Sequence, residues 1–383
     1  MKITNFAVLA ASAVFAGSLF SAPSPSDDKP RLVEFAKNKL PIVFVEDNGK
    51  RVSEMMFDSL QVVDGVTNFK LTYADGTPGS VFVPVDKGGV KFRYRETEAL
   101  KRMRSNYLSG NYEDAVKAGR HVVYPAVAIM GMPEDLTNVH DNLLVFVDCL
   151  LNTGRFIEAK SLMESLPLSK ATSTVGKAVI AYANKLISMD HYPDAEAVLE
   201  RLNFGGDNLE NIDDIMDLTS FLRRSGKIDE AVKWYTKLQA TPGNPRKNEA
   251  ILWMAYCDIV KGNTMSAEIF FDQLKDLKKT DDEFSLKSMI AGMLLENDKK
   301  LTDALDAYAE GIVYGDVSFN WFAELYYKTG MVYKALGFPK TSNEIFEQTA
   351  LLYPESNFAK LSKEQIVVIA EEPEEGEEDS LGE

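Results

Sequence analysis

The chain has 383 residues, of which 45% are hydrophobic and 26% are charged, as in ordinary globular proteins. It carries 42 Lys and Arg against 58 Asp and Glu, a formal net charge of −16, and eight of the acidic residues lie within residues 371–383. A net acidic chain binds polyanions poorly, so we exclude nucleic acid as the main partner. Two Cys and three His are too few for a disulfide framework or a cysteine- or histidine-rich metal site. We therefore expect no metal and no cofactor.

Residues 1–22 have the pattern of a secretory signal peptide. One Lys precedes an apolar run from Phe6 to Ala16 that is interrupted by Ser12, and small residues follow, which is the order typical of such signals. The run is too short to span a bilayer comfortably, and no later stretch approaches the roughly 18 apolar residues that a spanning helix needs. We predict an exported protein, periplasmic or secreted, without stable membrane insertion of the mature chain. A buried amino-terminal helix is the alternative, and residues 23–39 are expected to form a flexible leader.

Residues 40–95 carry strand and hairpin signals. Short runs rich in β-branched and aromatic residues stop at turns rich in Asp, Asn and Gly, and these runs are LPIVFVE, TNFKLTY, SVFVPV and VKFRY. Turn residues between such runs are typical of antiparallel strands. We predict a small β-rich segment of four or five short strands, which is too small to bury a large core alone and packs on the first helices.

A basic stretch begins in the last of these predicted strands. Phe92 and Tyr94 alternate with cations there, so one strand face is aromatic and the other is cationic. The basic residues are Lys91, Arg93, Arg95, Lys101, Arg102 and Arg104. One interpretation is a docking patch for an acidic partner or for the chain's own acidic residues 371–383. The second interpretation, which we favour, is a solvated cationic face over a covered pair of aromatic side chains.

From residue 96 onward the sequence repeats. Seven aligned segments end at a small residue, and the spacings between these ends are 44, 36, 36, 36, 37 and 38 residues; the small residues are Ala115, Ala159, Ala195, Ala231, Ala267, Ala304 and Ser342. Five residues before each of them lies a turn residue, namely Gly110, Gly154, Asp190, Gly226, Gly262, Lys299 or Gly337. Four residues after most of them lies a bulky apolar residue, namely Met163, Leu199, Tyr235, Phe271, Tyr308 or Phe346. Chance does not readily keep these positions in phase.

Each repeat is predicted to be a helix–turn–helix unit. A Gly or Asp permits the positive φ that closes the first helix, and an acidic turn suits the amino terminus of the second helix. The small residue lets the two helices approach closely, and the bulky residue one turn later fills the groove between them. One hairpin of this kind cannot bury its apolar face, whereas stacked neighbours can.

The pattern resembles the tetratricopeptide repeat (TPR) family over residues 96–356. The family's period is about 34 residues, with small residues at the eighth and twentieth positions, and aromatic residues such as Tyr112, Phe156 and Tyr192 match its seventeenth position. Pro354 matches the terminal proline, which is missing or displaced in the other repeats, and the fourth position holds Leu143, Val179, Ile215 and Ile251 in place of the frequent Trp. The resemblance implies a mainly α fold, a TPR-like α-solenoid of about seven helix-turn-helix repeats preceded by the antiparallel β-rich segment.

The rest of the chain is assigned around these repeats. The first spacing of 44 residues implies an insertion near residues 124–139, which we expect to be a long loop. The solenoid is predicted to cover residues 96–370 and to end in a capping helix over residues 356–370. Residues 371–383 are acidic and of low complexity, so we expect a disordered tail.

The resemblance also implies where a partner binds. In TPR arrays the first helix of each pair lines the concave face, and its fifth and ninth positions point toward the ligand. The predicted partner-binding residues are Leu144, Ile180, Asn184, Met216, Leu252, Tyr256, Met289, Met293, Tyr327 and Met331. Flexible thioethers and aromatic rings suit an adaptable groove for a peptide or helix. The alternative is that a tight superhelix buries these side chains as core.

Other kinds of site have little support in the sequence. The cationic clamp that some TPR domains use for terminal carboxylates is incomplete, because only Asn184 with Lys177 hints at it. No nucleophile elbow, phosphate loop or zinc-binding helix motif is present, His121 and His191 are expected on the surface, and His140 is expected to open a helix. Cys149 and Cys257 are predicted to be separate, buried and reduced.

We therefore predict an exported protein–protein interaction scaffold, not an enzyme, that binds a protein or peptide partner in cell-envelope assembly. A glycan- or cell-wall-associated binding protein is the alternative, and it requires solvent-facing aromatic residues. Only Trp234, Trp253 and Trp321 could supply tryptophan to such a site. The oligomeric state is left open.

Overall fold

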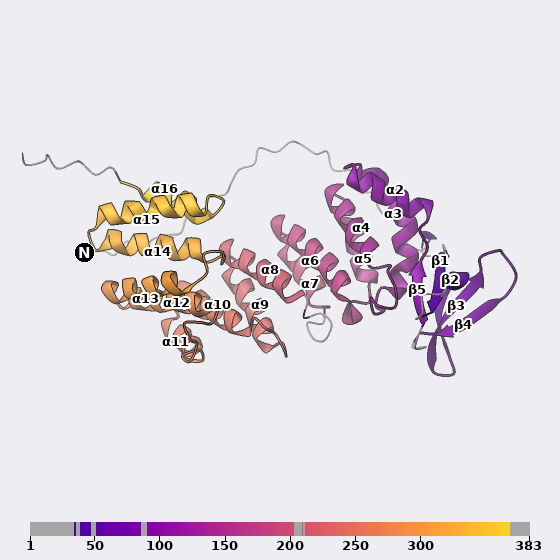
Figure 1. The fold of residues 1–383 in the computed structure, drawn as a ribbon, viewed down its shortest axis with the longest axis horizontal. Helices are drawn as coiled ribbons and strands as arrows, with labels where there is room; N and C mark the ends of the chain where they lie inside the picture. The colour runs from indigo at the N-terminus through magenta and orange to yellow at the C-terminus, as the bar shows by residue number, and fades with distance from the viewer. Residues whose placement is uncertain are drawn as a thin grey trace, which may run out of the picture. The chain divides into compact units, whose positions relative to one another are not determined.

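The computed structural model describes residues 34–35, 39–46, 51–85, 90–202, 209 and 211–367. Within them a five-stranded antiparallel sheet precedes a long series of helices (Figure 1), so the predicted fold class is confirmed. The chain divides into two compact units, Met1–Gly226 with Thr241–Asn244, and Lys227–Ala240 with Pro245–Glu383. The predicted signal peptide and acidic tail lie outside the described residues. Of the described helices, none combines the length and the apolar character that crossing a membrane demands.

The sheet belongs to the first unit. Its strands are β1 (Leu40–Glu46), β2 (Arg51–Val63), β3 (Val66–Tyr73), β4 (Ser80–Pro84) and β5 (Val90–Tyr94), in the order β4-β3-β2-β1-β5. Strands β1 to β4 follow one another as neighbours, whereas β5 returns to pair with β1. The sequence patterns above do not include β2, because a bulge between Phe57 and Ser59 breaks its alternation and removes the period of two that marks a strand.

One face of the sheet forms an aromatic core. The rings of Phe57 and Phe69 have centroids 5.9 Å apart, and those of Phe69 and Phe92 are 4.2 Å apart. Tyr94, two residues after Phe92, is also buried on this face. The predicted alternation in β5 is therefore confirmed, with the aromatic side chains inside and Lys91 and Arg93 half-buried on the other side.

The insertion at residues 124–139 is a loop, as its length predicted, only after its first six residues. It begins with η1 (Tyr124–Ile129), a 3₁₀ helix in which four of six residues are buried. Farther along, the main-chain N–H of Phe92 donates to the carbonyl of Leu136 at 2.6 Å, and the N–H of Tyr94 donates to Asn138 Oδ1 at 2.7 Å. The insertion therefore occupies the open edge of β5 and joins the sheet to the helices, satisfying edge groups that would otherwise be unpaired.

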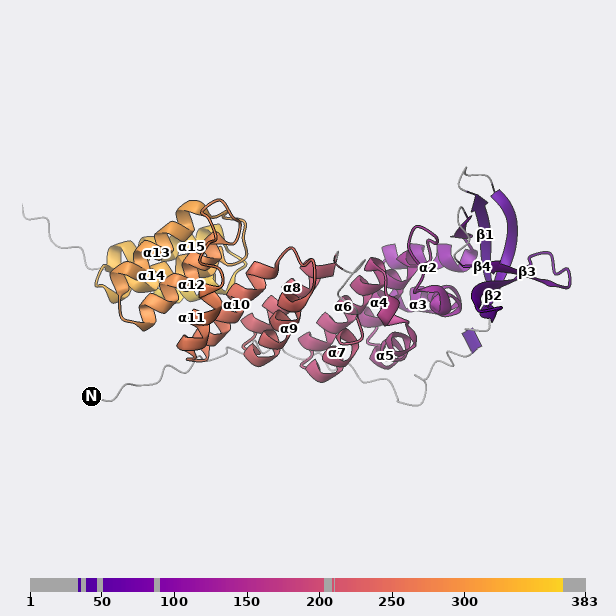
Figure 2. The same cartoon turned by 90° about the horizontal axis from the view of Figure 1, so that it is seen from below.

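The helices of the first unit form antiparallel pairs. They are α2 (Glu98–Leu108), α3 (Tyr112–Val123), α4 (Asp141–Asn152), α5 (Phe156–Ser165), η2 (Leu168–Lys170), α6 (Ser173–Ser188), α7 (Tyr192–Leu199) and α8 (Ile212–Arg224). The pairs α2/α3, α4/α5 and α6/α7 each pack together, and α4 also packs on α6. Figure 2 shows the same succession of helices from a second side.

The second unit continues the pattern. Its helices are α9 (Ile228–Ala240), α10 (Lys247–Val260), α11 (Thr264–Asp272), α12 (Phe284–Asn297), α13 (Leu301–Tyr314), α14 (Phe322–Ala335), α15 (Pro339–Leu352) and α16 (Asn357–Gln365). The pairs α10/α11, α12/α13 and α14/α15 pack together, and α16 covers both α14 and α15. In Figures 1 and 2 alike, α12 to α15 lie side by side.

The in-phase positions of the repeats have the predicted conformation. All seven turn residues have positive φ, between 64° at Lys299 and 83° at Gly337, including the non-glycine Asp190. The seven small residues are buried, six of them at 0% exposure and Ser342 at 1%. A positive φ closes each first helix, and the absence of a large side chain allows the second helix to approach.

Glycine at the eighth position brings two of these pairs especially close. A Cβ atom added to Gly292 of α12 lies 2.5 Å from Cδ1 of Tyr308 in α13. The equivalent atom on Gly330 of α14 lies 2.6 Å from Cε1 of Phe346 in α15. At both sites an aromatic ring from the second helix occupies the space that a side chain on the first would need.

His140 is a buried histidine at the start of α4. It is 2% exposed, and among the described residues neither ring nitrogen has a hydrogen-bond partner in normal geometry. Burial lowers its pKa, and this outweighs the raising effects of the Glu134 carboxylate and of the main-chain carbonyls of Met130 and Thr137. The position of His140 at a helix start was predicted, but the burial of its side chain beside the insertion was not. Burial favours the neutral form of the imidazole ring.

This burial predicts a pH-dependent stability. The unfolded chain takes up a proton near the ordinary histidine pKa of about 6.5, whereas the folded chain does so only at lower pH. We expect the free energy of unfolding to fall as pH drops from about 7.5 to 5.5, with a slope from His140 of at most about 1.4 kcal/mol per pH unit. Denaturant unfolding at three pH values should show a shallower slope for His140→Leu, and equal slopes would contradict this assignment.

Candidate polypeptide-binding site

A polar hollow of about 390 Å³ lies between α4 and α6 in the first unit. Its lining comes from the first helices of two successive repeats and comprises Asp148, Leu151, Asn152, Ala181, Asn184, Lys185 and Ser188. Asp148 and Asn184 occupy the same ninth position in their repeats. The structure therefore brings two successive ninth positions together at one accessible site.

The α4 wall of the hollow is held by hydrogen bonds. Asn152 Nδ2 donates to the main-chain oxygen of Asp148 at 2.9 Å and to its Oδ1 at 3.0 Å. The Asp148 carboxylate also lies near the Tyr107 hydroxyl of α2, and its interaction with the hydroxyl, together with burial, raises the pKa of Tyr107. Asp148 is thereby oriented while its carboxylate keeps further acceptor capacity.

The α6 wall offers the amide of Asn184 and the ammonium group of Lys185. Asn184 is exposed and, within the part of the chain that the structure describes, its amide makes no hydrogen bond. Lys185 is also exposed, and Ser188 Oγ donates to the main-chain oxygen of Lys185 at 2.7 Å. A primary amide can donate and accept at once. Asn184 can therefore pair with one N–H and one C=O of an extended chain.

The other predicted partner-binding residues of the first unit expose less side-chain surface than Asn184. Leu144 of α4 is half-buried, Ile180 of α6 is 3% exposed, and Met216 of α8 is fully buried. Of the predicted positions in this unit, only Leu144 and Asn184 present side-chain surface to a partner.

In the second unit the predicted apolar row lies largely in the core. Leu252 and Met289 are fully buried, and Met293 is 6% exposed. Met331 of α14 is half-buried. Side chains in this state supply packing to neighbouring helices rather than contact area to a ligand. The partner-binding role assigned to them stays a prediction.

The two predicted tyrosines of the second unit are engaged within the protein. The Tyr256 hydroxyl donates to Glu324 Oε1 at 2.6 Å, and Glu324 is 3% exposed. The ring of Tyr327 lies between Phe346 of α15 and Phe358 of α16, at centroid distances of 5.9 and 5.6 Å. Both hold α14 against its neighbours, one by a buried polar contact and the other through ring packing.

All three tryptophans are buried. Trp234 and Trp253 are at 0% exposure and Trp321 is at 4%. Trp253 Nε1 donates to Glu249 Oε1 at 3.0 Å, and Trp321 Nε1 donates to Ser285 Oγ at 2.9 Å. None of them presents a face on which a sugar ring could stack, so the structure adds no support for glycan binding.

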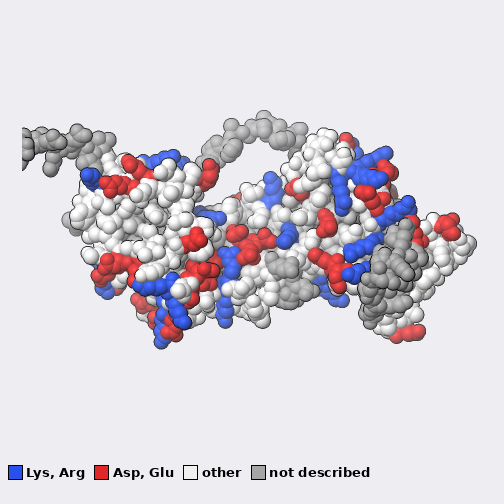
Figure 3. Space-filling model, in the orientation of Figure 1, with Lys and Arg blue, Asp and Glu red and all other residues white. Residues whose placement is uncertain are grey.

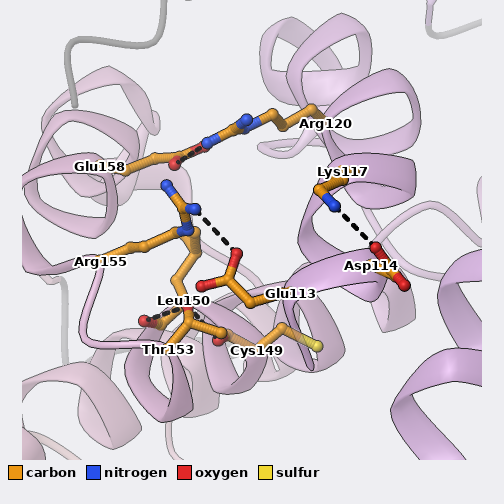
Figure 4. A network of polar contacts seen from close by, with 9 residues as sticks. All are labelled: Glu113, Asp114, Lys117, Arg120, Cys149, Leu150, Thr153, Arg155 and Glu158. Atoms are coloured by element: carbon orange, nitrogen blue, oxygen red, sulfur yellow. Dashed lines mark hydrogen bonds and ion pairs between the residues drawn. The ribbon is translucent and has the colours of Figure 1, made fainter. Parts of the chain in front are cut away.

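An ion pair with a buried carboxylate joins α3 to α5 (Figure 4). Arg120 of α3 donates to both carboxylate oxygens of Glu158 in α5, at 2.8 and 2.6 Å, and the Tyr124 hydroxyl donates to the same carboxylate at 2.7 Å. Glu158 is 1% exposed. A second pair, Arg155 with Glu113 at 2.8 Å, joins the same helices nearer the surface. These contacts join the second helices of two successive repeats.

The titratable groups that the sequence singled out do not form a reactive cluster in the described part of the chain. His121 and His191 are exposed as predicted, and Cys149 and Cys257 are buried and free. Burial raises the pKa of the Cys149 thiol to about 11, with the nearby Asp148 carboxylate adding to the shift. Among the described residues, no three or more His, Cys, Asp or Glu side chains gather to hold a metal ion.

Sequence reasoning missed part of the hollow. Asn152 and Ser188 lie one helical turn after the ninth positions Asp148 and Asn184, and Lys185 directly follows Asn184. The spacing of four residues places side chains on one helix face. Extending the ninth-position pattern by one turn would have identified Asn152 and Ser188.

The turn conformations, the buried small residues and the paired helices decide the class of repeat. The repeats are tetratricopeptide-like. No protein-family model and no curated protein matches the chain. Among solved structures, PilF of Pseudomonas aeruginosa is similar at 14% identity over 59% of this chain and 97% of its own, with a TM-score of 0.34.

Two further solved structures are similar. One is a chain of the Cut9–Hcn1 hetero-tetramer of the APC/C, which is 14% identical. The match covers 70% of this chain and 55% of that chain, with a TM-score of 0.36. The other is Acl4, an assembly chaperone of RpL4, with 11% identity, 70% of this chain and 94% of that chain covered, and a TM-score of 0.33.

Proposed function

We propose that the chain is a non-catalytic scaffold that binds an extended segment of a partner protein in the hollow between α4 and α6. The observation that carries this proposal is the pairing of Asp148 with Asn184 in one open hollow, where the Asn184 amide makes no hydrogen bond within the described residues. Leu144, which lies on α4 with Asp148, supplies half-buried apolar surface.

The hollow suits main-chain recognition. An extended peptide presents one N–H and one C=O per residue. The Asn184 amide can bond one of each, the Asp148 carboxylate can accept an N–H, and Lys185 adds a cation at the rim. Bonds of this kind hold a peptide in a fixed direction while leaving its side chains to set specificity.

We further propose that the protein acts after export, in the assembly of the cell envelope. The support is the pattern of residues 1–22, with a basic start, a short apolar run and small residues after it. Fractionation of cells that produce the full chain and a chain lacking residues 1–22 tests the compartment. We expect only the full chain outside the cytoplasm, and retention of both chains in the cytoplasm would contradict export.

Peptide selection tests the proposed site. A random library of displayed peptides is selected against the full chain, and the Kd of each enriched peptide is measured by fluorescence anisotropy. We expect Asn184→Ala to weaken these peptides about tenfold, because a lost pair of hydrogen bonds costs about 1.4 kcal/mol.

The matched control is Asn297→Ala, which removes an exposed amide from α12 in the other unit. It should leave Kd unchanged. Peptides whose affinity responds equally to the two variants would bind elsewhere and would overturn the proposed site.

A further inference from the structure

Strand β4 lies at the edge of the sheet that the insertion does not cover. The strand order places β4 and β5 at the two edges, and the edge of β5 is bonded to Leu136. On its outer side β4 has, among the described residues, no neighbouring strand and no main-chain hydrogen bond. An edge of this kind presents N–H and C=O groups with which another strand can pair.

The register of β4 shows which of its main-chain groups face outward. The N–H of Val85, directly after β4, donates to the carbonyl of Thr67 in β3 at 3.0 Å. Because bonding alternates along an antiparallel pair, every second residue of β4 bonds to β3 and the residues between them face outward. The outward residues are Ser80, Phe82 and Pro84. Pro84 has no N–H, so the outward donors are the N–H groups of Ser80 and Phe82, while all three residues offer a carbonyl.

This strand lacks the charges that commonly protect a sheet edge. Residues 76–85, which include the whole of β4, contain no Lys, Arg, Asp or Glu, in a chain of which 26% is charged. Phe82 is 42% exposed, and Lys70, which lies opposite it on β3, pairs with Asp58 at 2.9 Å. Where β3 and β4 are visible in Figure 3, their surface is mostly uncharged. A second strand can therefore approach β4 without burying an unpaired charge.

We propose that β4 pairs with β4 of a second copy of the chain, antiparallel and centred on Phe82, so that the two sheets become continuous. In this register the two Phe82 residues exchange N–H and C=O bonds. Each Ser80 N–H donates to the carbonyl of the opposite Pro84. The missing N–H of Pro84 falls opposite the carbonyl of Ser80, which lies at the exposed start of the strand. Both outward donors of each copy therefore find an acceptor.

The same register also suits the side chains. Directly opposite residues of an antiparallel pair point to one face, so the two Phe82 rings meet on the face opposite the aromatic core. No charged residue of β4 faces its counterpart, although two copies of a chain with a net charge of −16 repel each other elsewhere. The contact is short, so the dimer is weak and its population depends on protein concentration.

Sedimentation equilibrium of the full chain tests the pairing. We expect a reversible monomer–dimer equilibrium as the protein concentration rises from about 1 to about 100 µM. Phe82→Lys places like charges directly opposite each other and should raise the Kd of the dimer at least about tenfold. The matched control Val62→Lys adds the same charge at an exposed position of β2 and should leave Kd unchanged. A native chain that stays monomeric, or equal Kd values for the two variants, would overturn the proposal.

Disulfide crosslinking tests the register itself. Directly opposite residues at a bonded position have Cα atoms about 5.5 Å apart, which a disulfide can span. With an added oxidant we expect Phe82→Cys to form a reducible covalent dimer and Val62→Cys to stay monomeric, while the native Cys149 and Cys257 are buried. Equal dimer yields from the two variants, or no dimer from Phe82→Cys, would contradict the pairing of β4. Asn184→Ala should not affect either measurement, which keeps this test separate from that of the proposed function.

Discussion

Replacing Gly292 by alanine is expected to lower the free energy of unfolding by about 2 to 3 kcal/mol, as measured by denaturant unfolding. In most helices this change stabilises by about 1 kcal/mol, because alanine has the higher helix propensity. Here the added methyl group would lie 2.5 Å from Cδ1 of the buried Tyr308 ring. The clash can be relieved only by moving α12 away from α13 or by displacing the ring.

A double-mutant cycle separates this clash from other effects. Tyr308→Leu removes the ring, so Gly292→Ala should cost less in that background than in the native chain, even though Tyr308→Leu is itself destabilising. The Tyr308 hydroxyl also donates a hydrogen bond to Glu296. Tyr308→Leu removes this bond both with and without Gly292→Ala, so its loss cancels in the cycle. Equal costs in the two backgrounds, or a stabilising Gly292→Ala, would show that the two helices do not approach as described.

Replacing Glu158 by alanine is expected to destabilise the first unit by about 3 kcal/mol. The variant leaves Arg120, whose side chain is only 21% exposed, without its carboxylate partner. It also removes the acceptor of the Tyr124 hydroxyl. A charge that stays partly buried without a partner costs more than the pair contributed, so the effect exceeds that of an ordinary hydrogen bond. Chemical unfolding monitored by far-UV circular dichroism measures it.

Glu113→Ala is the matched control for this prediction. Glu113 pairs with Arg155 between the same helices, but its side chain is 55% exposed, and such pairs contribute about 1 kcal/mol or less. Tyr124→Phe should cost about 1 kcal/mol, because it removes one hydrogen bond and leaves the ion pair in place. A Glu158→Ala cost no larger than that of Glu113→Ala would contradict the burial of the ion pair.

The repeat architecture could be predicted because it rests on local rules. A turn residue with positive φ and a small residue five positions later are needed wherever two helices close into a hairpin, so they recur in phase from Gly110 to Ser342. Asp190 and Lys299 adopt the same backbone as the glycines, which shows that the hairpin geometry outweighs the residue's own preference.

Features that depend on contacts between distant segments could not be predicted in the same way. Strand β2 is hidden by its bulge, and the insertion lies at the edge of β5 through bonds between residues more than forty positions apart. No spacing rule marks either feature. The pattern of turns and alternation nevertheless predicted the sheet and its aromatic face.

The inner surface of the helices was only partly predictable. The helical period places Met216, Leu252 and Met289 at equivalent positions of their repeats, but whether such a side chain is buried depends on the contacts that neighbouring helices make. In the second unit Leu252 and Met289 are buried, while in the first unit a polar hollow remains between α4 and α6 at Asp148 and Asn184. Sequence pattern identifies which side chains occupy equivalent positions, whereas contacts with neighbouring helices decide which of them stay accessible to a partner.

Site-specific photo-crosslinking tests the proposed binding site most directly. A photoreactive amino acid is placed at position 184 in the hollow or at position 157, which is 56% exposed on the second helix α5, and each protein is irradiated in cells that produce it. We expect a discrete protein adduct from position 184 and none from position 157. Adducts of equal yield from both positions, or an adduct from position 157 alone, would contradict it.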